Sequence, residues 1–190
     1  MIYHSKKLFS KEEAYKIRGY ARELKDRVIG TYHEDINQGI HDPKGGHNLA
    51  DHIPWSLSTK YNWVYDRILD WTKTFDLPKD IVNLGHEIIL QKYLVGFEFK
   101  PHIDDVLSKD KKTIKRIRHY TILMQLSEKN EYKGGDLFIK TDKENKVSKE
   151  IGTVSIFSQG IIHWVNPITD GERWSATIFL EKTALEKDLL

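Results

Sequence analysis

The chain has 190 residues, of which 39% are hydrophobic and 31% charged, a balance typical of a folded globular protein rather than a disordered one. Thirty basic and 28 acidic residues leave a formal net charge of +2, so no overall field favours a polyanionic partner. The sequence contains no cysteine, which excludes disulfides, thiolate metal sites and cysteine nucleophiles and leaves His, Asp and Glu as candidate metal ligands.

The length suits a single domain, which we expect to span residues 1–190. The N-terminus lacks the apolar run of a signal peptide. No apolar segment approaches the roughly 18 residues that cross a bilayer. We therefore expect a cytoplasmic protein with no membrane partner.

The first half of the chain predicts two helices separated by a long loop. Ser10 and Glu13 have the spacing of a capping box, and apolar residues then recur at helical intervals, which predicts a helix over 11–27. Residues 30–54 are polar and rich in turn formers, so they are predicted to form a surface loop. A second helical pattern covers 58–75.

The loop over 30–54 holds four histidines, which form either a second metal site or a set of solvated side chains: His33, His41, His47 and His52. Loops of this length in compact domains often have functions, so a role in covering a substrate stays open.

The second half changes to short runs of strand-forming residues, predicted over 86–95, 97–104, 119–126, 134–140, 151–157, 161–165 and 173–180. A basic loop over 109–118 and a charged turn over 142–150 interrupt them. Helices followed by many short strands indicate an α+β fold. We expect a double-stranded β-helix (jelly roll) over 85–182, with the N-terminal helices packed on one sheet and residues 1–84 as helical support and loop.

His102 and Asp104 lie two residues apart in an extended run, so their side chains point to the same side of the strand. They offer an imidazole nitrogen and a carboxylate oxygen to a common point. Those are two of the three ligands in the arrangement of two histidines and one carboxylate that holds non-haem Fe(II) and leaves positions open. A solvated His–Asp pair at a strand end is the alternative.

A third ligand can come from far along the chain, because a jelly roll places sequence-distant strands side by side. His163 sits at the centre of the apolar run Ile161–Val165. A histidine satisfied within the core is the alternative for this position.

The strand that begins at Arg173 has a polar face. Arg173, Ser175 and Thr177 share this face by strand alternation, and an arginine is rarely buried without a partner. A guanidinium flanked by two hydroxyls would bind a small carboxylate well, because its fork can engage two oxygens at once. The alternatives are an arginine that faces solvent or bonds an internal aspartate.

Short motifs of the second half follow one another in a fixed order: Gln91–Gly96 leading to Pro101–Asp104, then Tyr132–Leu137, Gly152–Phe157, and His163–Pro167 with Gly171–Ser175. With the order His-x-Asp, His, Arg, this part of the chain, about residues 85–182, resembles the Fe(II)/2-oxoglutarate-dependent oxygenases. The resemblance is strongest to their prolyl-4-hydroxylase-like branch.

The resemblance implies that His102, Asp104 and His163 bind Fe(II) and that Arg173 binds the distal carboxylate of 2-oxoglutarate. It further implies a dioxygenase that uses O2, with ascorbate as an optional reductant, and releases succinate and CO2. The substrate would be an unactivated C–H bond, in a peptidyl or free amino acid or another small molecule. Halogenating relatives lack the carboxylate ligand, so Asp104 favours hydroxylation.

The same resemblance gives roles to residues around Arg173. Ser175 and Thr177 would add hydroxyl donors for the cosubstrate. Tyr93 matches a family tyrosine that often reaches 2-oxoglutarate, although a core tyrosine is the alternative. The chain departs from the family at Gln125, where close prolyl-hydroxylase relatives carry a tyrosine near the same carboxylate, so whether Gln125 contacts 2-oxoglutarate is left open.

Two other functions are alternatives to hydroxylation. One is a non-enzymatic jelly-roll module whose histidines hold a structural metal. The other is an oxidative demethylase of nucleic acid, a partner that we do not expect. Relatives of that branch carry a second arginine where this chain has Phe179, and the basic loop over 109–118 lacks the interleaved aromatic residues of a stacking platform.

Overall fold

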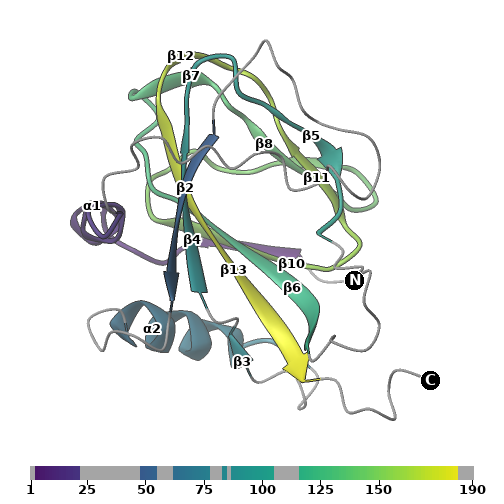
Figure 1. The fold of residues 1–190 in the computed structure, drawn as a ribbon. Coiled ribbons are helices and arrows are strands. Elements are labelled where there is room, and N and C mark those ends of the chain that lie inside the picture. The colour runs from purple at the N-terminus through teal and green to yellow at the C-terminus, as the bar shows by residue number, and fades with distance from the viewer. Residues whose placement is uncertain are drawn as a thin grey trace.

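The computed structural model describes residues 3–21, 48–54, 62–77, 83–84, 87–104 and 116–183. Within these ranges the chain forms antiparallel β-sheets with two helices (Figure 1). The larger sheet has the strand order β1-β10-β6-β13-β4-β2, and β3 also pairs with β13. Its strands are β1 (Tyr3–Lys7), β2 (Asn48–Pro54), β3 (Asn83–Leu84), β4 (Glu87–Tyr93), β6 (Arg116–Gln125), β10 (Thr153–Ser158) and β13 (Arg173–Thr183).

A second sheet has the order β5-β11-β8-β9, and β12 pairs with β7 in a separate ribbon at one end of the molecule (Figure 1). These strands are β5 (Phe99–His102), β7 (Tyr132–Gly134), β8 (Leu137–Lys140), β9 (Glu144–Lys146), β11 (Ile162–Val165) and β12 (Ile168–Gly171). An apolar cluster joins the two sheets, because Phe157 of β10 packs with Leu137 and Val165 of the smaller sheet.

The strands of the larger sheet separate two kinds of side chain by their alternation. On β13, Ala176 and Ile178 belong to the main hydrophobic core, whereas the buried residues Arg173, Ser175 and Thr177 alternate with them. The sharing of one face by these three residues, predicted from sequence, is confirmed. This polar face positions the candidate site.

The main core cluster contains side chains from both helices, α1 (Lys11–Arg18) and α2 (Asn62–Thr72), together with side chains of the larger sheet. Its fully buried members include Ile17 of α1, Ile68 of α2 and Ile122 of β6. The predicted capping box is confirmed. The backbone N–H of Glu13 donates to Ser10 Oγ (3.2 Å), and the Ser10 N–H donates to Glu13 Oε2 (2.9 Å).

Both helices are shorter than their patterns predicted. The helix expected over 11–27 ends at Arg18, because Gly19 acts as its C-cap and glycine has low helix propensity. Residues 22–27 lie outside the described part. The helix expected to reach residue 75 ends at Thr72, and the Thr72 hydroxyl donates to the Leu69 carbonyl in its last turn (2.8 Å).

The expectation of a loop over 30–54 is wrong for its last seven residues, which form strand β2. β2 is an edge strand that pairs only with β4 among the described strands, and edge strands tolerate polar residues and proline. The rest of that loop, including His33, His41 and His47, lies outside the described residues. So do residues 109–115 of the basic loop, while its last residues, 116–118, begin β6.

Besides β2 and the two-residue β3, three further strands were not predicted, and they are short or polar. β1 precedes α1 and pairs with β10, so strands do not simply follow helices along the chain. β9 lies within the predicted charged turn, and β12 pairs with β7. Each has mostly exposed side chains, so it lacks the apolar pattern that marks a strand in sequence. Among the described residues, neither helix has the length and apolar character needed to cross a bilayer.

Candidate active site

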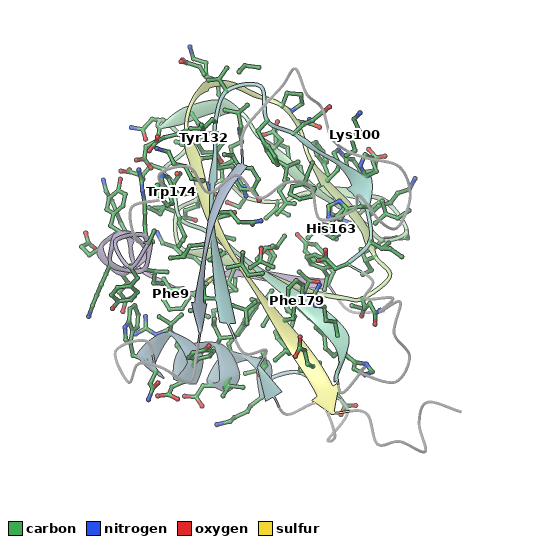
Figure 2. All side chains as sticks on the ribbon, in the orientation of Figure 1. Phe9, Lys100, Tyr132, His163, Trp174 and Phe179 are labelled. Atoms are coloured by element: carbon green, nitrogen blue, oxygen red, sulfur yellow. The ribbon has the colours of Figure 1, made fainter. Side chains whose placement is uncertain are left out.

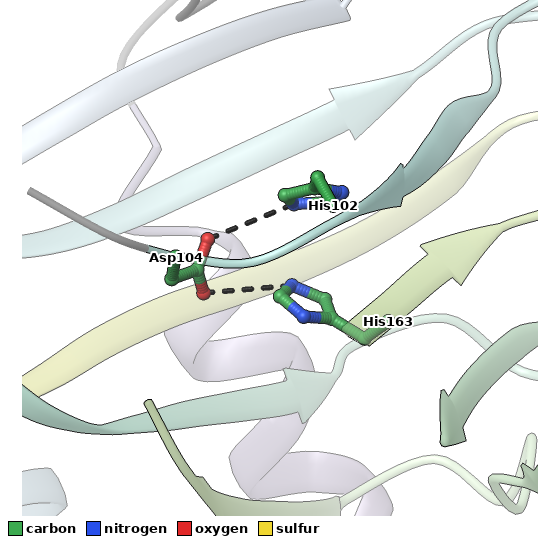
Figure 3. A group of neighbouring side chains, drawn as sticks. All are labelled: His102, Asp104 and His163. Atoms are coloured by element: carbon green, nitrogen blue, oxygen red, sulfur yellow. Dashed lines mark ion pairs between the residues drawn. The ribbon is translucent and has the colours of Figure 1, made fainter. Parts of the chain in front are cut away.

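The three predicted metal ligands meet at the facing ends of β5 and β11. His102 ends β5, Asp104 follows two residues later, and the antiparallel register places His163 of β11 opposite His102. The two imidazole ring centres lie 4.2 Å apart. Figure 3 shows the Asp104 carboxylate beside the two rings, with one oxygen facing each ring. The strand pairing thus joins residues that are far apart in the sequence.

The distances at this point suit a single metal ion. His102 Nε2 lies 3.6 Å from Asp104 Oδ1, and His163 Nε2 lies 3.4 Å from Asp104 Oδ2. All three ligand atoms lie within 4.8 Å of one another. Neighbouring ligands of an octahedral ion with bonds of about 2.1 Å stand about 3 Å apart. Over the described ranges this is the one group of three His, Asp or Glu residues with such spacing.

Backbone carbonyls orient both imidazole rings. His102 Nδ1 lies 2.7 Å from the Lys100 carbonyl oxygen, and His163 Nδ1 lies 3.1 Å from that of Ile161. A carbonyl only accepts hydrogen bonds, so Nδ1 carries the proton in each ring and donates it. In the neutral imidazoles, Nε2 is then the nitrogen with a lone pair, and both Nε2 atoms face Asp104.

Asp104 is held as a carboxylate. Burial raises the pKa of Asp104. A hydrogen bond from His102 and the charges of the two imidazoles, which apply when the rings are protonated, and a hydrogen bond from Thr121 lower this pKa by more, so the net shift is downward. The Thr121 hydroxyl donates to Oδ2 at 2.7 Å. Burial lowers the pKa of His163 more than Asp104 raises it. An ionised carboxylate and a neutral imidazole are the forms that metal binding requires.

These three ligands line a cavity that is mostly apolar. Its walls include Ile89, Leu123, Leu137 and Phe179, and Arg118 lies on the same lining. The guanidinium of Arg118 stacks on the Phe179 ring at 3.6 Å. Such a cavity would exclude water from the ligands and leave room for a small molecule beside them.

Arg173 lies next to this cavity and has no internal counter-ion among the described residues. It is 3% exposed, and its Nε and Nη1 atoms have no hydrogen-bond partner. Its guanidinium stands 5.0 Å from the Tyr93 ring. It lines a second cavity, which shares Leu123 and Leu137 with the first. Burying an unpaired cation is costly, so this site fits an anion that comes from outside the chain.

The hydroxyls expected beside Arg173 converge on a residue that the sequence did not reveal. Gln91 Oε1 accepts hydrogen bonds from Thr177 (3.1 Å), Ser175 (3.5 Å) and the Tyr93 hydroxyl (2.9 Å). Gln91 stands opposite Ser175 in the β4–β13 register and lines the metal-site cavity, as do Tyr93 and Thr177. Its spacing of two from Tyr93 is the one signal that could have identified it.

Tyr93 remains a neutral phenol. Burial raises its pKa more than the charge of Arg173 lowers it. Gln125 is buried on β6, and its amide nitrogen donates to the Ser127 carbonyl (2.8 Å) and to the Tyr132 hydroxyl (2.9 Å). Both of its amide hydrogens are therefore engaged within the protein.

Comparisons with known proteins agree with this geometry. Residues 88–181 match the family model of the 2OG-Fe(II) oxygenase superfamily. A PKHD-type hydroxylase of Pseudomonas fluorescens (strain Pf0-1) is 27% identical over 190 residues, which cover 99% of this chain and 81% of the relative.

Two solved structures share the fold. The 2OG complex of the viral collagen prolyl hydroxylase from Paramecium bursaria Chlorella virus-1 has a TM-score of 0.67 at 15% identity, covering 96% of each chain. A prolyl hydroxylase from Trichoplax adhaerens, in complex with a peptide fragment of the oxygen degradation domain of hypoxia inducible factor, has a TM-score of 0.67 at 13% identity. That match covers 98% of this chain and 85% of the other. The chain belongs to the 2-oxoglutarate- and Fe(II)-dependent oxygenase superfamily, in its prolyl-4-hydroxylase-like branch.

Proposed function

We propose that the chain hydroxylates an unactivated C–H bond of a peptidyl or free amino acid, with Fe(II), 2-oxoglutarate and O2. Membership of the family makes it a 2-oxoglutarate-dependent hydroxylase. The observation that carries the residue assignment is the convergence of His102, Asp104 and His163 on one point, beside a cavity that holds the unpaired Arg173.

His102, Asp104 and His163 would hold Fe(II) through the two Nε2 atoms and the carboxylate. The two Nδ1–H groups, bonded to backbone carbonyls, keep the rings aimed at the metal. Three protein ligands leave coordination positions open. When bound, the iron with 2-oxoglutarate and O2 supplies the oxidising chemistry, with succinate and CO2 as the coproducts.

Arg173 would anchor the distal carboxylate of 2-oxoglutarate. Its unpartnered Nε and Nη1 support this role, because a bidentate carboxylate satisfies two guanidinium donors at once. Tyr93, Ser175 and Thr177 support the same end of the site through their shared hydrogen bonds to Gln91. That these three residues contact the cosubstrate is a prediction.

The substrate would enter past Ile89 and Phe179, which form an apolar pair on the cavity wall. Such a wall suits the aliphatic part of a side chain, and Arg118 beside it offers a donor to a polar backbone or terminal group. The Trichoplax relative was solved with a peptide, which favours a peptidyl substrate. Ascorbate would act only as a reductant for the metal.

We extend the proposal to the organisation of the chain. Residues 1–190 would form one cytoplasmic domain, with residues 1–84 as support and 85–182 as a double-stranded β-helix. The core cluster shared by α1, α2 and the larger sheet supports packing of the helices on that sheet. The likeness to the prolyl hydroxylase structures supports the β-helix.

The nucleic-acid alternative gains no support from the site. Phe179 is buried against Ile89, so the position where that branch has its second arginine is part of an apolar wall. A structural metal site is also disfavoured, because a closed metal site has no use for an unpaired arginine in the adjoining cavity.

A turnover assay tests the proposal. Purified protein with Fe(II), 2-oxoglutarate and O2 is incubated with pools of peptides and amino acids, and each pool is analysed by mass spectrometry for the gain of one oxygen atom. We expect a product in at least one pool, no product with His163→Ala, and normal product with His4→Ala, a histidine that stacks on Phe75 away from the site. Absence of both oxygenated product and succinate from the native protein would reject the proposal.

A further inference from the structure

We infer that the Tyr132 hydroxyl is a second anchor for the carboxylate that Arg173 binds, and that Gln125 is the residue that positions it. The inference rests on the proposed function, since that carboxylate is taken to be the distal group of 2-oxoglutarate. Three features support it: the hydrogen bonds of Gln125, the Tyr132 hydroxyl hydrogen that is not donated to another group, and the charges around one small cavity.

The Tyr132 ring is fixed in the protein interior. It is 4% exposed and belongs to one apolar cluster with Tyr93 and Ile168. Gly135, at φ +62°, passes so close that an added Cβ would meet the Tyr132 ring and the Ile168 side chain. A ring held in this way cannot turn its hydroxyl elsewhere, so the direction of that group is set by packing.

Hydrogen-bond accounting leaves the Tyr132 hydroxyl with one hydrogen to donate. Gln125 Nε2 donates to the Ser127 carbonyl and to Tyr132 Oη, which therefore acts as an acceptor. A phenol that accepts one bond still carries its own hydrogen. The Tyr132 hydroxyl donates no hydrogen bond within the described residues, and a buried donor without a partner calls for one.

The orientation of the Gln125 amide is determined by its surroundings. The reversed orientation would place Oε1 against the Ser127 carbonyl oxygen, two acceptors with no hydrogen between them. Ser127 cannot move aside easily, because it is fully buried and its hydroxyl accepts a hydrogen bond from the Trp174 backbone N–H (2.8 Å). Gln125 therefore presents its NH2 group, and not its oxygen, to Tyr132.

The charges around the cavity leave room for one carboxylate. Tyr132, Gln125, Lys149 and Arg173 all line it. The Lys149 ammonium lies 2.8 Å from Asp136 Oδ1 and also donates to the Gly134 carbonyl, so this cation is already paired. Arg173 is then the cation that lacks a counter-ion within the described ranges.

A carboxylate has about four lone-pair sites, so it can take the guanidinium fork and one hydroxyl together. The hydroxyls of Ser175 and Thr177 donate to Gln91, whereas the Tyr132 hydrogen has no such engagement. Figure 2 shows Tyr132 toward the β7–β12 end of the molecule and Phe179 farther along β13, so the anchor and the apolar wall at the substrate side lie apart. Tyr132 thus acts on the cosubstrate and not on the substrate.

The test compares two ligands that differ only at the distal end. Calorimetry without O2 measures the Kd of 2-oxoglutarate and of 2-oxopentanoate, which has a methyl group in place of the distal carboxylate, for Mn(II)-loaded protein. We expect Tyr132→Phe to raise the Kd of 2-oxoglutarate about tenfold, the effect of one hydrogen bond to a charged group. The Kd of 2-oxopentanoate should not change.

Matched variants separate this role from a general effect. Tyr15→Phe removes a hydroxyl that donates to Glu128 on the surface, so it should leave both Kd values unchanged. Gln125→Met keeps the Tyr132 hydroxyl but removes the group that orients it. This variant should raise the Kd of 2-oxoglutarate, by less than Tyr132→Phe does, and leave the Kd of 2-oxopentanoate unchanged. If Tyr132→Phe does not fold, Gln125→Met carries the test alone.

The outcomes distinguish this inference from the proposed function. If the native protein binds 2-oxoglutarate and neither variant raises its Kd relative to that of 2-oxopentanoate, the anchor role of Tyr132 is wrong while the proposed function stands. An equal loss for both ligands would also overturn the role, because the hydroxyl would then act away from the distal carboxylate. If the native protein binds no 2-oxoglutarate with metal present, the proposed function itself fails.

Discussion

Arg173 is the residue whose surroundings require a ligand most clearly. It is buried, it stacks near Tyr93, and two of its nitrogens lack partners. Its position on the polar face of β13 follows from strand alternation and was predictable from sequence. The sequence could not predict that no internal aspartate lies beside Arg173, because such a partner could have come from any strand of the sheet.

Replacing Arg173 with methionine should abolish most cosubstrate affinity. The change removes a bidentate charged contact while it preserves much of the side-chain volume, so we expect the Kd of 2-oxoglutarate to rise by more than about tenfold. Calorimetry on Mn(II)-loaded protein measures it. Arg67→Met, which removes a half-exposed arginine paired with Glu13, is the matched control and should bind normally. Normal binding by Arg173→Met would contradict its role.

Sequence spacing could predict part of the metal site but not all of it. The period of two placed His102 and Asp104 on one side, and the structure brings them together with His163. That meeting depends on the β5–β11 register, which places His163 opposite His102 across 60 residues of chain and is not encoded in any local pattern. Gln91 was not identified for a similar reason, since two of its three hydrogen-bond partners lie on the neighbouring strand β13.

At the scale of elements, the strongest local signals were the most accurate. The capping box predicted the start of α1, because its two hydrogen bonds depend only on residues three apart. Helix ends and edge strands were less predictable. The stop at Gly19 is set by a single glycine C-cap inside a longer helical pattern. The strand β2 depends on its pairing with β4, a tertiary contact that can override propensity.

The capping box gives a stability prediction. Ser10→Ala removes the oxygen that accepts from the Glu13 N–H, so we expect the free energy of unfolding to fall by about 1 kcal/mol. Urea denaturation measures the change. Ser10→Asp keeps an acceptor at the N-cap and should restore most of the loss. If the alanine and aspartate variants are equally destabilised, the cap does not contribute as described.

Gly134, the last residue of β7, and Gly160, between β10 and β11, form a matched pair of glycines. Gly134 and Gly160 both have positive φ, at 70° and 81°, but a Cβ on Gly134 would collide with the Pro167 carbonyl, whereas one on Gly160 would meet open space. Each alanine variant should lose about 1 to 2 kcal/mol from the left-handed conformation. Gly134→Ala should lose distinctly more in urea denaturation, and equal losses would show that the Pro167 contact can relax.

At the scale of the whole molecule, two sheets hold the site between them while the helices complete a separate core on the far face of the larger sheet. The α+β class and the order of the motifs were predictable because they depend on composition and chain order. The jelly-roll prediction led us to expect that strands far apart in the sequence would meet, but not which strands become neighbours, since no periodicity reports it.

Ligand binding should stabilise the molecule as a whole. If Mn(II) and 2-oxoglutarate bind the folded state alone, a ligand at about 100 times its Kd adds about 2.7 kcal/mol to the free energy of unfolding. The midpoint of thermal unfolding should therefore rise with both present. In Asp104→Ala, which lacks the carboxylate ligand, the rise should largely disappear, whereas Asp170→Ala, a surface carboxylate paired with Lys133, should keep it. An unchanged rise in Asp104→Ala would place the metal elsewhere.

The most direct test of the account is an anaerobic titration of 2-oxoglutarate into the protein with and without Fe(II). The claim is that His102, Asp104 and His163 hold one iron, and that this iron and Arg173 bind 2-oxoglutarate together. We predict tight binding of one equivalent when Fe(II) is present and much weaker binding when it is absent. Equal binding in both titrations, or none in either, would contradict it.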